Sequence, residues 1–243
     1  MLRKMIGKLK SVSKKNLARF RARKAVRDGL FDDIDRTKLT ALRKENEGHY
    51  AQKYHDKFEH SLVRNAERLY RLGLDKGPKL RIFDIGSGFG YFLYGAKKMG
   101  HKPVGLDLPD EYLSAVTHLL GLKKVLHRIE PFQPLPEIPG GPFDLITAFA
   151  TCFDNAGFPG QWGAKEWRAF MKDLRRFMAP GCKVHFKFNQ YLGQGTRSGI
   201  GCRTVTEELW EYFHALGGTF DKRTMEILDA PARLDAEAKA PKA

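Results

Sequence analysis

The stretch from Leu80 to Tyr91 constrains the fold of this chain more than any other. It begins as an apolar run of β-forming residues and ends in three glycines spaced two apart, Gly86, Gly88 and Gly90. An amphipathic segment follows at once. A strand, a glycine turn and a helix in this order are typical of an open α/β sheet, whose ligands bind at the carboxyl ends of the strands. Glycine lets the backbone turn sharply and come close to such a ligand.

Strand and helix signals alternate along the rest of the chain. After the first strand, strand patterns occupy residues 103–108, 124–129, 143–149 and 183–188. Helical patterns lie between and after them, at residues 111–120, 164–178 and 206–216, and residues 219–228 supply one or two edge strands. Five strands separated by helices predict an α/β fold with a doubly wound, mostly parallel, Rossmann-like sheet.

The composition along the chain predicts four regions. Residues 1–28 form a basic amphipathic arm, and residues 29–79 form a helical extension before the first strand. Residues 80–228 form the α/β domain. Residues 229–243 are rich in Ala, Lys and Pro, a composition that predicts a disordered tail.

An aromatic stripe lies within the helical extension. Tyr50, Tyr54 and Phe58 recur at four-residue intervals, which is the spacing of one helix face. This pattern favours packing in a core. The alternative is a lid over a ligand site, built from Tyr50, Tyr54 or His49.

The basic arm accounts for most of the net charge of +15, because residues 1–27 contain eleven Lys or Arg and no acidic residue. On a helical wheel, several apolar residues fall within roughly 140° of arc. They are Leu2, Met5, Ile6, Leu9, Val12, Leu17 and Phe20. A solvated tail, an anionic membrane surface and RNA phosphates are three interpretations of such a helix. The apolar stripe favours the membrane over RNA, since phosphate contacts need no stripe.

The three cysteines form no CxxC pair, so we predict no zinc site and no other metal site. No apolar run approaches the length of about 18 residues that a membrane span needs. Charges also interrupt any apolar run that could serve as a signal peptide. We therefore expect a cytoplasmic protein, with attachment to the inner face of a membrane as an alternative.

The residues around the glycine turn narrow the choice of ligand. The dinucleotide fingerprint GxGxxG would require a third glycine where the chain has Tyr91. Instead, Asp84 precedes the turn, and a carboxylate there suits an amino group better than a pyrophosphate. Asp107 ends the next strand, where an acid can accept hydrogen bonds from ribose hydroxyls. A ligand with an amine, a ribose and no phosphate describes S-adenosylmethionine.

Residues 82–108 resemble motif I and the acidic end of the second strand in class I S-adenosylmethionine-dependent methyltransferases. Residues 143–149 and 177–184 resemble the fourth strand and the turn into the fifth strand of that family, so the resemblance covers roughly residues 80–228. It implies backbone contacts with the cofactor at the glycines, ribose binding at the strand-end acid, adenine packing beside it, and a methyl group near the end of the fourth strand. The implied cofactor-binding residues are Asp84, Gly86, Ser87, Gly88, Gly90, Asp107, Leu108 and Phe149.

Methyl transfer to an acceptor needs little more than in-line positioning and removal of a proton. Asp154 is our candidate base, because it lies five residues after the end of the fourth predicted strand. Its alternative role is to cap or stabilise the loop. His185 lies inside a strand pattern and is predicted to be a packed core histidine. Cys152 follows Thr151 rather than a proline, which disfavours the nucleophile used by enzymes that methylate pyrimidine carbon 5.

These residues predict a methyltransferase that acts on an oxygen or nitrogen atom of a small-molecule or glycan acceptor. Residues 150–153 do not match the [DNS]-Pro-Pro-[aromatic] motif of DNA amine methylators, which argues against methylation of adenine N6 or cytosine N4. Two alternatives stay open. One is an RNA methyltransferase that grips its substrate with residues 1–27, and the other is a non-catalytic binding protein with the same fold. The acceptor and the oligomeric state are left open.

Overall fold

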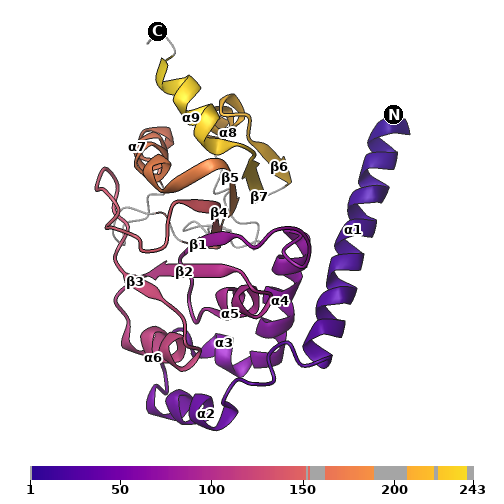
Figure 1. Cartoon of the computed structure of the whole chain (residues 1–243), viewed down its shortest axis with the longest axis vertical. Coiled ribbons are helices and arrows are strands. Elements are labelled where there is room, and N and C mark those ends of the chain that lie inside the picture. Colours follow the sequence, from indigo (N-terminus) through magenta and orange to yellow (C-terminus); the bar gives the residue numbers. More distant parts are fainter. Residues whose placement is uncertain (1, 152, 154–161, 189–206, 222–223, 240–243) are drawn as a thin grey trace, which may run out of the picture. The chain divides into compact units, whose positions relative to one another are not determined.

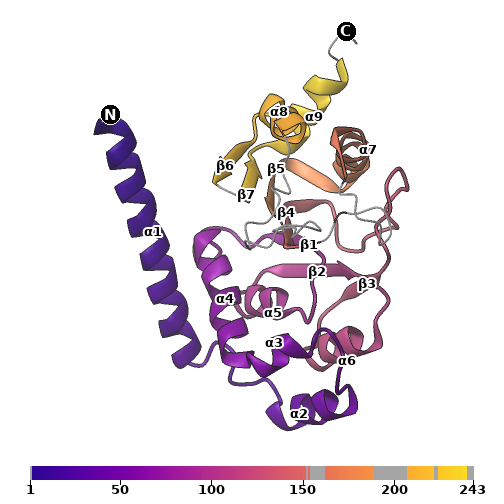
Figure 2. The same cartoon turned by 180° about the vertical axis from the view of Figure 1, so that it is seen from behind.

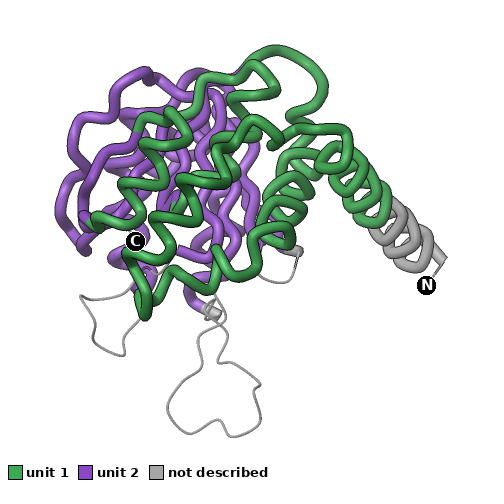
Figure 3. The backbone as a smooth tube through the Cα atoms, turned by 90° about the horizontal axis from the view of Figure 1, so that it is seen from below, with its two compact units in different colours: residues 1–79, 88–103, 110–123 green, residues 80–87, 104–109, 124–243 purple. Residues whose placement is uncertain are grey.

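The computed structural model describes residues 2–151, 153, 162–188, 207–221 and 224–239, with the backbone alone for residues 2–13, 207, 221 and 239. The chain forms two compact units (Figure 3). Unit 1 comprises residues 1–79, 88–103 and 110–123, and unit 2 comprises residues 80–87, 104–109 and 124–243. The first boundary agrees with the predicted start of the α/β domain after residue 79. The later boundaries differ from the prediction, because two helical segments of the expected domain belong to unit 1.

A seven-stranded sheet forms the centre of unit 2 (Figure 1). Its strands are β1 (Arg81–Ile85), β2 (Lys102–Asp107), β3 (Lys124–Leu126), β4 (Phe143–Phe149), β5 (Met178–Lys187), β6 (Thr219–Asp221) and β7 (Thr224–Ile227). They lie in the order β3-β2-β1-β4-β5-β7-β6, and β7 runs antiparallel to both of its neighbours. The order changes direction between β1 and β4, as expected for a doubly wound sheet. The predicted mostly parallel, Rossmann-like sheet is therefore confirmed.

The two faces of this sheet differ in polarity. One face packs its apolar side chains with α7 (Ala164–Leu174), α8 (Glu207–Ala215) and α9 (Ala230–Lys239) into one core. The strand residues in this core include Phe83, Ile85, Ile146, Ala148, Val184, Phe186, Met225 and Ile227. The residues that alternate with them point to the opposite face, because successive side chains of a strand alternate. That second face holds Asp84 of β1, Thr147 of β4, His185 of β5 and Glu226 of β7, beside buried apolar residues such as Ile82 and Leu145.

Unit 1 is built from helices (Figure 2). They are α1 (Leu2–Arg27), α2 (Arg36–Glu45), α3 (Gln52–Asp56), α4 (Phe58–Arg71), α5 (Tyr91–Lys98) and α6 (Glu111–Leu119). Helix α4 packs against both α1 and α5, and α2 packs against α6. Buried side chains such as Phe31, Leu62 and Tyr112 join these helices into a second core. None of the helices in the described ranges combines the length and the apolar character that crossing a bilayer requires.

The basic arm is helical as predicted, but its second half is not a separate arm. Ala18 and Ala22 are buried where α1 meets α4, and such small side chains let two helix backbones approach. Arg21 forms an ion pair with Asp75, and its guanidinium lies 4.7 Å from the ring centroid of Tyr70. This half of α1 is therefore part of unit 1.

The prediction of a disordered tail is wrong for residues 230–239, which form α9. Ala230 and Leu234 lie four residues apart and are both buried in the core of unit 2. Asp235 also accepts two hydrogen bonds from Arg175, at 2.9 and 2.8 Å. An overall polar composition hid one apolar helix face that the sheet core covers.

Candidate functional site

The carboxyl end of β1 holds a buried carboxylate. Asp84 is buried, and its Oδ1 accepts a 2.6 Å hydrogen bond from the Thr147 hydroxyl on the neighbouring strand. The two residues are direct partners in the parallel register of β1 and β4. A buried carboxylate needs such partners, because desolvation without compensation is costly. Asp84 thus helps to join the two strands, and its contact with a ligand amine stays a prediction.

The three glycines of the turn all have left-handed backbones, with φ of 71°, 58° and 81° for Gly86, Gly88 and Gly90. A Cβ added at Gly86 would lie 2.3 Å from the Thr151 hydroxyl oxygen, and one at Gly90 would lie 2.6 Å from a methyl carbon of Leu122. A Cβ added at Gly88 would meet no described atom within 4 Å, apart from its chain neighbours. The first and third glycines therefore serve packing, whereas Gly88 has open space for a ligand.

The backbone donors at the start of the turn are already used. The N–H groups of Gly86 and Ser87 both donate to the carbonyl of Leu106 on β2, at 2.7 and 3.2 Å. They hold the turn against the adjacent strand. The predicted backbone contacts with a cofactor therefore cannot rest on these two N–H groups in this arrangement.

The side chain of Ser87 tests whether a polar ligand fits at this turn. Its hydroxyl oxygen is buried and has no hydrogen-bond partner within the described part of the chain. A buried hydroxyl without a partner costs about 1–3 kcal/mol. A cofactor that offers a polar atom at this point would remove that cost, so the residues present fit the nucleoside that the sequence predicts.

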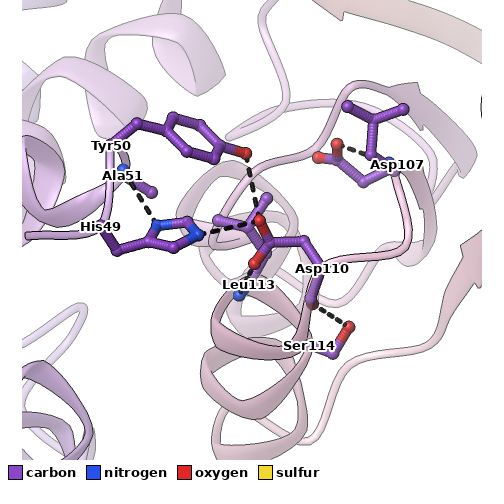
Figure 4. Close-up of polar contacts among 8 residues, drawn as sticks. His49, Tyr50, Ala51, Asp107, Asp110, Leu113 and Ser114 are labelled. Atoms are coloured by element: carbon purple, nitrogen blue, oxygen red, sulfur yellow. Dashed lines mark hydrogen bonds and ion pairs between the residues drawn. The ribbon is translucent and has the colours of Figure 1, made fainter. Parts of the chain in front are cut away.

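Asp107 lies at the end of β2, as predicted (Figure 4). One oxygen of its carboxylate accepts a 2.8 Å hydrogen bond from the backbone N–H of Leu108. Its backbone carbonyl accepts a further bond from His127, at 2.8 Å. The Leu108 side chain is exposed and offers an apolar surface beside the carboxylate. Binding of ribose by Asp107 and of adenine by Leu108 stay predictions.

The end of β4 has an unusual backbone. Phe149 is half-buried, and the next residue, Ala150, is a non-glycine residue with φ of 61°. The Ala150 N–H donates to the Lys187 carbonyl at 2.7 Å, and the Thr151 hydroxyl donates to the Ile85 carbonyl at 2.7 Å. Strained residues of this kind persist where the surroundings hold them, and they cluster at ligand sites. The loop after β4 is thus fixed to β1, at the point where the strand order reverses.

The candidate base Asp154 lies outside the described residues, as does Cys152. Cys182, by contrast, is buried, and this burial raises the pKa of its thiol to about 12. A thiol that stays protonated at neutral pH is a poor nucleophile, because the thiolate is the reactive form. No group of three or more metal-binding side chains comes together in the described ranges.

The sequence reading missed a His–Glu pair on the polar face of the sheet. His185 was predicted to be a packed core residue, but its Nδ1 lies 2.6 Å from Glu226 Oε1 on β7. Lys183 Nζ lies 3.2 Å from the same oxygen. The hydrogen bond with His185, followed by the Lys183 charge, lowers the pKa of Glu226 to about 2. The His185 ring centroid is 5.6 Å from that of Phe149, so the pair lies near the end of β4.

A signal for this pair was present in β5. Lys183, His185 and Lys187 alternate with the buried Val184 and Phe186, which is the pattern of a strand with one polar face. Glu226 could not be found in this way, because it lies 41 residues away in sequence.

A second polar cluster lies within unit 1 (Figure 4). His49 Nε2 is 3.1 Å from Asp110 Oδ2, and the Tyr50 hydroxyl donates to the same oxygen at 3.3 Å. The other oxygen of Asp110 accepts from the Leu113 N–H at 2.8 Å, which makes Asp110 the N-cap of α6. The His49 Nδ1 accepts from the Ala51 N–H at 3.2 Å. Both ring nitrogens are therefore engaged, so His49 is a structural link in this state.

The sequence pattern favoured core packing of the whole aromatic stripe, but only one of its three residues packs in this way. Tyr50 is 58% exposed and Tyr54 is 44% exposed, whereas Phe58 packs against the core of unit 1. Core packing is therefore wrong for the first two residues. The lid role stays a prediction.

Comparisons with known proteins give distant likenesses. No family model and no curated protein matches the chain. An amino pentose methyltransferase from Micromonospora echinaspora, solved with S-adenosylmethionine, is 19% identical, with a TM-score of 0.40 over 63% of this chain and 57% of its own. The antibiotic-resistance methyltransferase Kmr is 18% identical, with a TM-score of 0.42 over 67% of this chain and 92% of its own.

A further likeness is an S-adenosylmethionine-dependent methyltransferase from Mesorhizobium loti, which is 22% identical with a TM-score of 0.36. That match covers 49% of this chain and 52% of the other. This chain thus spans little more than half the length of two of the three proteins. Identities and TM-scores this low decide neither the activity nor the acceptor.

Proposed function

We propose that this protein is an S-adenosylmethionine-dependent methyltransferase that acts on an oxygen or nitrogen atom of a small-molecule or glycan acceptor. The observation that carries the proposal is the set of polar groups at the carboxyl ends of β1 and β2. The buried Ser87 hydroxyl has no partner among the described residues, and Asp107 ends the adjacent strand. Ligands of open α/β sheets bind at this edge, where the strand order reverses.

Each residue at this edge has a role that suits its chemistry. The Asp107 carboxylate accepts hydrogen bonds from ribose hydroxyls, and the exposed Leu108 side chain packs against adenine. The Ser87 hydroxyl pairs with a polar atom of the cofactor. The open space at Gly88 lets the backbone come close to it. The bound cofactor supplies a methyl group that its sulfonium already activates.

The chain must also take a proton from the acceptor. With Nδ1–H donating to Glu226, the Nε2 of His185 keeps a lone pair that can accept this proton. Glu226 stays ionised at neutral pH, because His185 lowers its pKa, and it stabilises the imidazolium that forms. We therefore assign His185 as the base and Glu226 as its positioning residue, with Asp154 as the alternative base.

Titration calorimetry with S-adenosylhomocysteine tests the cofactor site. We expect one site per chain, strongly weakened in Asp107→Ala and unchanged in Asp144→Asn, which changes a carboxylate at the opposite end of the strands. The complete absence of binding by the unaltered protein would overturn the proposal.

A second experiment separates binding from transfer. His185→Gln should keep its affinity for S-adenosylhomocysteine but lose transfer of radiolabelled methyl groups to the fraction of a cell extract that accepts them. If His185→Gln transfers methyl groups normally, Asp154 becomes the leading candidate.

The same extract experiment separates the alternatives. Incorporation into RNA would favour an RNA methyltransferase, an option motivated by the eleven basic residues within 1–27. RNA affinity should then fall steeply with salt. No incorporation into lipid, glycan, RNA or protein fractions would favour a non-catalytic binding protein.

We also infer a cytoplasmic location. Cys182 is a free, buried thiol, and the sequence has no CxxC pair, which suits a reducing compartment. Cell fractionation with antibody detection tests this, and recovery of the protein outside the cell would contradict it.

A further inference from the structure

Helix α1 presents two different faces between Lys14 and Arg27. Ala18 and Ala22 are buried where the helix packs against α4. Leu17 and Phe20 are 57% and 63% exposed. With 3.6 residues per turn, the centres of these two pairs lie roughly 150° apart around the helix axis. The apolar residues therefore lie on the side that faces away from α4.

Leu17 and Phe20 are the two members of the predicted apolar stripe whose side chains the structure describes. Their exposure is notable because the same helix already has a packed face. A packed helix normally presents polar residues on its solvent side. Here the solvent side carries Leu17 and Phe20, which no other described element covers in the way that α4 covers the alanines.

Basic residues line the same stretch of helix, and by the same spacing Lys14 and Arg23 flank the exposed pair at roughly 90° on either side of its centre. Lys14, Lys15, Arg19, Arg23 and Arg27 are all exposed, and none of the five forms an ion pair with another described residue. Lys24 is the exception, because it pairs with Asp28. Residues 1–27 contain no acid, so nothing within the helix neutralises this charge.

We propose that this outward face of α1, formed by Leu17, Phe20 and the basic residues that flank them, docks on an anionic lipid bilayer. Apolar side chains enter the boundary between headgroups and acyl chains, while Lys and Arg meet the lipid phosphates. Both kinds of group are needed for reversible attachment to a membrane surface. RNA would use the cations but gains nothing from an exposed leucine.

The opposite face makes this docking compatible with the fold. Arg21 is anchored by Asp75 and by the ring of Tyr70, and the alanines stay against α4. The helix can therefore meet a bilayer without leaving unit 1. The proposal is independent of the methyltransferase activity, since it concerns a different surface.

Vesicle co-sedimentation of the full chain tests the proposal. The probes are vesicles of phosphatidylcholine alone and of phosphatidylcholine mixed with phosphatidylglycerol, at low and high salt. We expect binding to the anionic vesicles, weakened by salt, and little binding to the neutral ones. The double variant Leu17→Ser with Phe20→Ser should bind at least about tenfold more weakly.

A matched double variant removes charge but keeps the apolar pair. Lys14→Gln with Arg23→Gln should lose about tenfold at low salt and less at high salt, where screening already weakens the charges. Circular dichroism and S-adenosylhomocysteine binding of both variants check that the fold is kept. A protein that fails to bind the cofactor but still binds vesicles would refute the enzymatic proposal alone.

Three results would overturn the docking proposal. The first is no binding to anionic vesicles, and the second is binding that the serine variant leaves unchanged. The third is tight, salt-sensitive binding to a single-stranded oligouridylate, without vesicle binding, that only the glutamine variant weakens. The last result would assign the basic face to nucleic acid.

Discussion

The polar groups at the amino ends of strands β1 and β4 are hydrogen-bonded to one another, whereas those at the carboxyl ends are only partly so. At the amino end, the Arg81 guanidinium donates two hydrogen bonds to the Asp144 carboxylate, at 3.1 and 2.8 Å. The Arg81 backbone N–H adds a third, at 2.8 Å, and these bonds lower the pKa of Asp144. At the carboxyl end, the Ser87 hydroxyl has no hydrogen-bond partner among the described residues, and the backbone of Ala150 is in the left-handed region.

This difference indicates that the amino end stabilises the sheet and the carboxyl end binds a ligand. Polar groups at the amino end satisfy one another, so they serve the stability of the sheet. At the carboxyl end, the Ser87 hydroxyl, left without a partner by the described residues, and the strained Ala150 backbone each raise the free energy of the folded protein. Such unfavourable features cluster at ligand sites. Substitutions at the two ends should therefore change different measurements.

The largest effect is expected at the glycine turn itself. Gly86→Ala combines a left-handed backbone with a clash 2.3 Å from the Thr151 hydroxyl oxygen, and should lower the free energy of unfolding by about 2–4 kcal/mol. Gly88→Ala has the backbone strain without the clash and should lose about 1–2 kcal/mol. Urea unfolding measures both. Equal losses would mean that the contact with Thr151 does not restrict this position.

The second prediction sets the two carboxylates against each other. Asp107→Ala should weaken binding of S-adenosylhomocysteine about 30-fold or more, because hydrogen bonds to a charged group are each worth about 1.5–3 kcal/mol. Asp144→Asn should leave this affinity unchanged and slightly lower the free energy of unfolding. Calorimetry and urea unfolding measure the pair. An affinity loss in Asp144→Asn would break the proposed division between the ends.

The third prediction concerns the unpartnered hydroxyl. Ser87→Ala should leave the unliganded protein equally stable or up to about 1 kcal/mol more stable, because it removes a buried polar atom that has no partner among the described residues. The same change should weaken cofactor binding about fivefold. Thermal unfolding with and without S-adenosylhomocysteine measures both effects. A clear loss of stability in the unliganded variant would show that this hydroxyl has a partner in solution.

The smallest effect is expected from Glu226 and appears only in acid. Its pKa is about 2 in the folded protein, below the ordinary value of 4.5, so its contribution to stability is full above about pH 4.5. That contribution is lost as the pH falls toward 2. Its size is of the order of 1 kcal/mol, because solvent screens a partly exposed pair.

Urea unfolding of Glu226→Gln at pH 7 and at pH 3 checks this. The variant should lose less stability than the unaltered protein between the two conditions. Parallel losses would contradict the assigned hydrogen bond between His185 and Glu226.

Local signals explain what the sequence predicted correctly. The turn at Gly86 and the end of β2 at Asp107 each depend on residues within one strand–turn–helix unit. The stripe of Tyr50 and Tyr54 showed helical spacing but not which surface would cover it. The position of β7 between β5 and β6, and with it the contact of Glu226 with His185, depends on pairing between distant segments.

The carboxyl-terminal tail shows that composition alone can mispredict disorder. Its Ala-, Lys- and Pro-rich composition is typical of disorder, yet Ala230 and Leu234 find a prepared apolar surface on the sheet. Such a helix gains its stability from packing rather than from its own propensity. Composition alone contains no information about that surface.

The path of the chain through the two units has a consequence for how the protein can be divided. The chain passes from one unit to the other five times, at residues 79, 87, 103, 109 and 123. A ribosome therefore completes the core of unit 1 only after it has made the first two strands of unit 2. Removing residues 1–79 would leave α5 and α6 without Leu62 and Ala66, their partners in that core. We expect the two units to unfold in one cooperative step, and neither can be obtained by cutting the chain once.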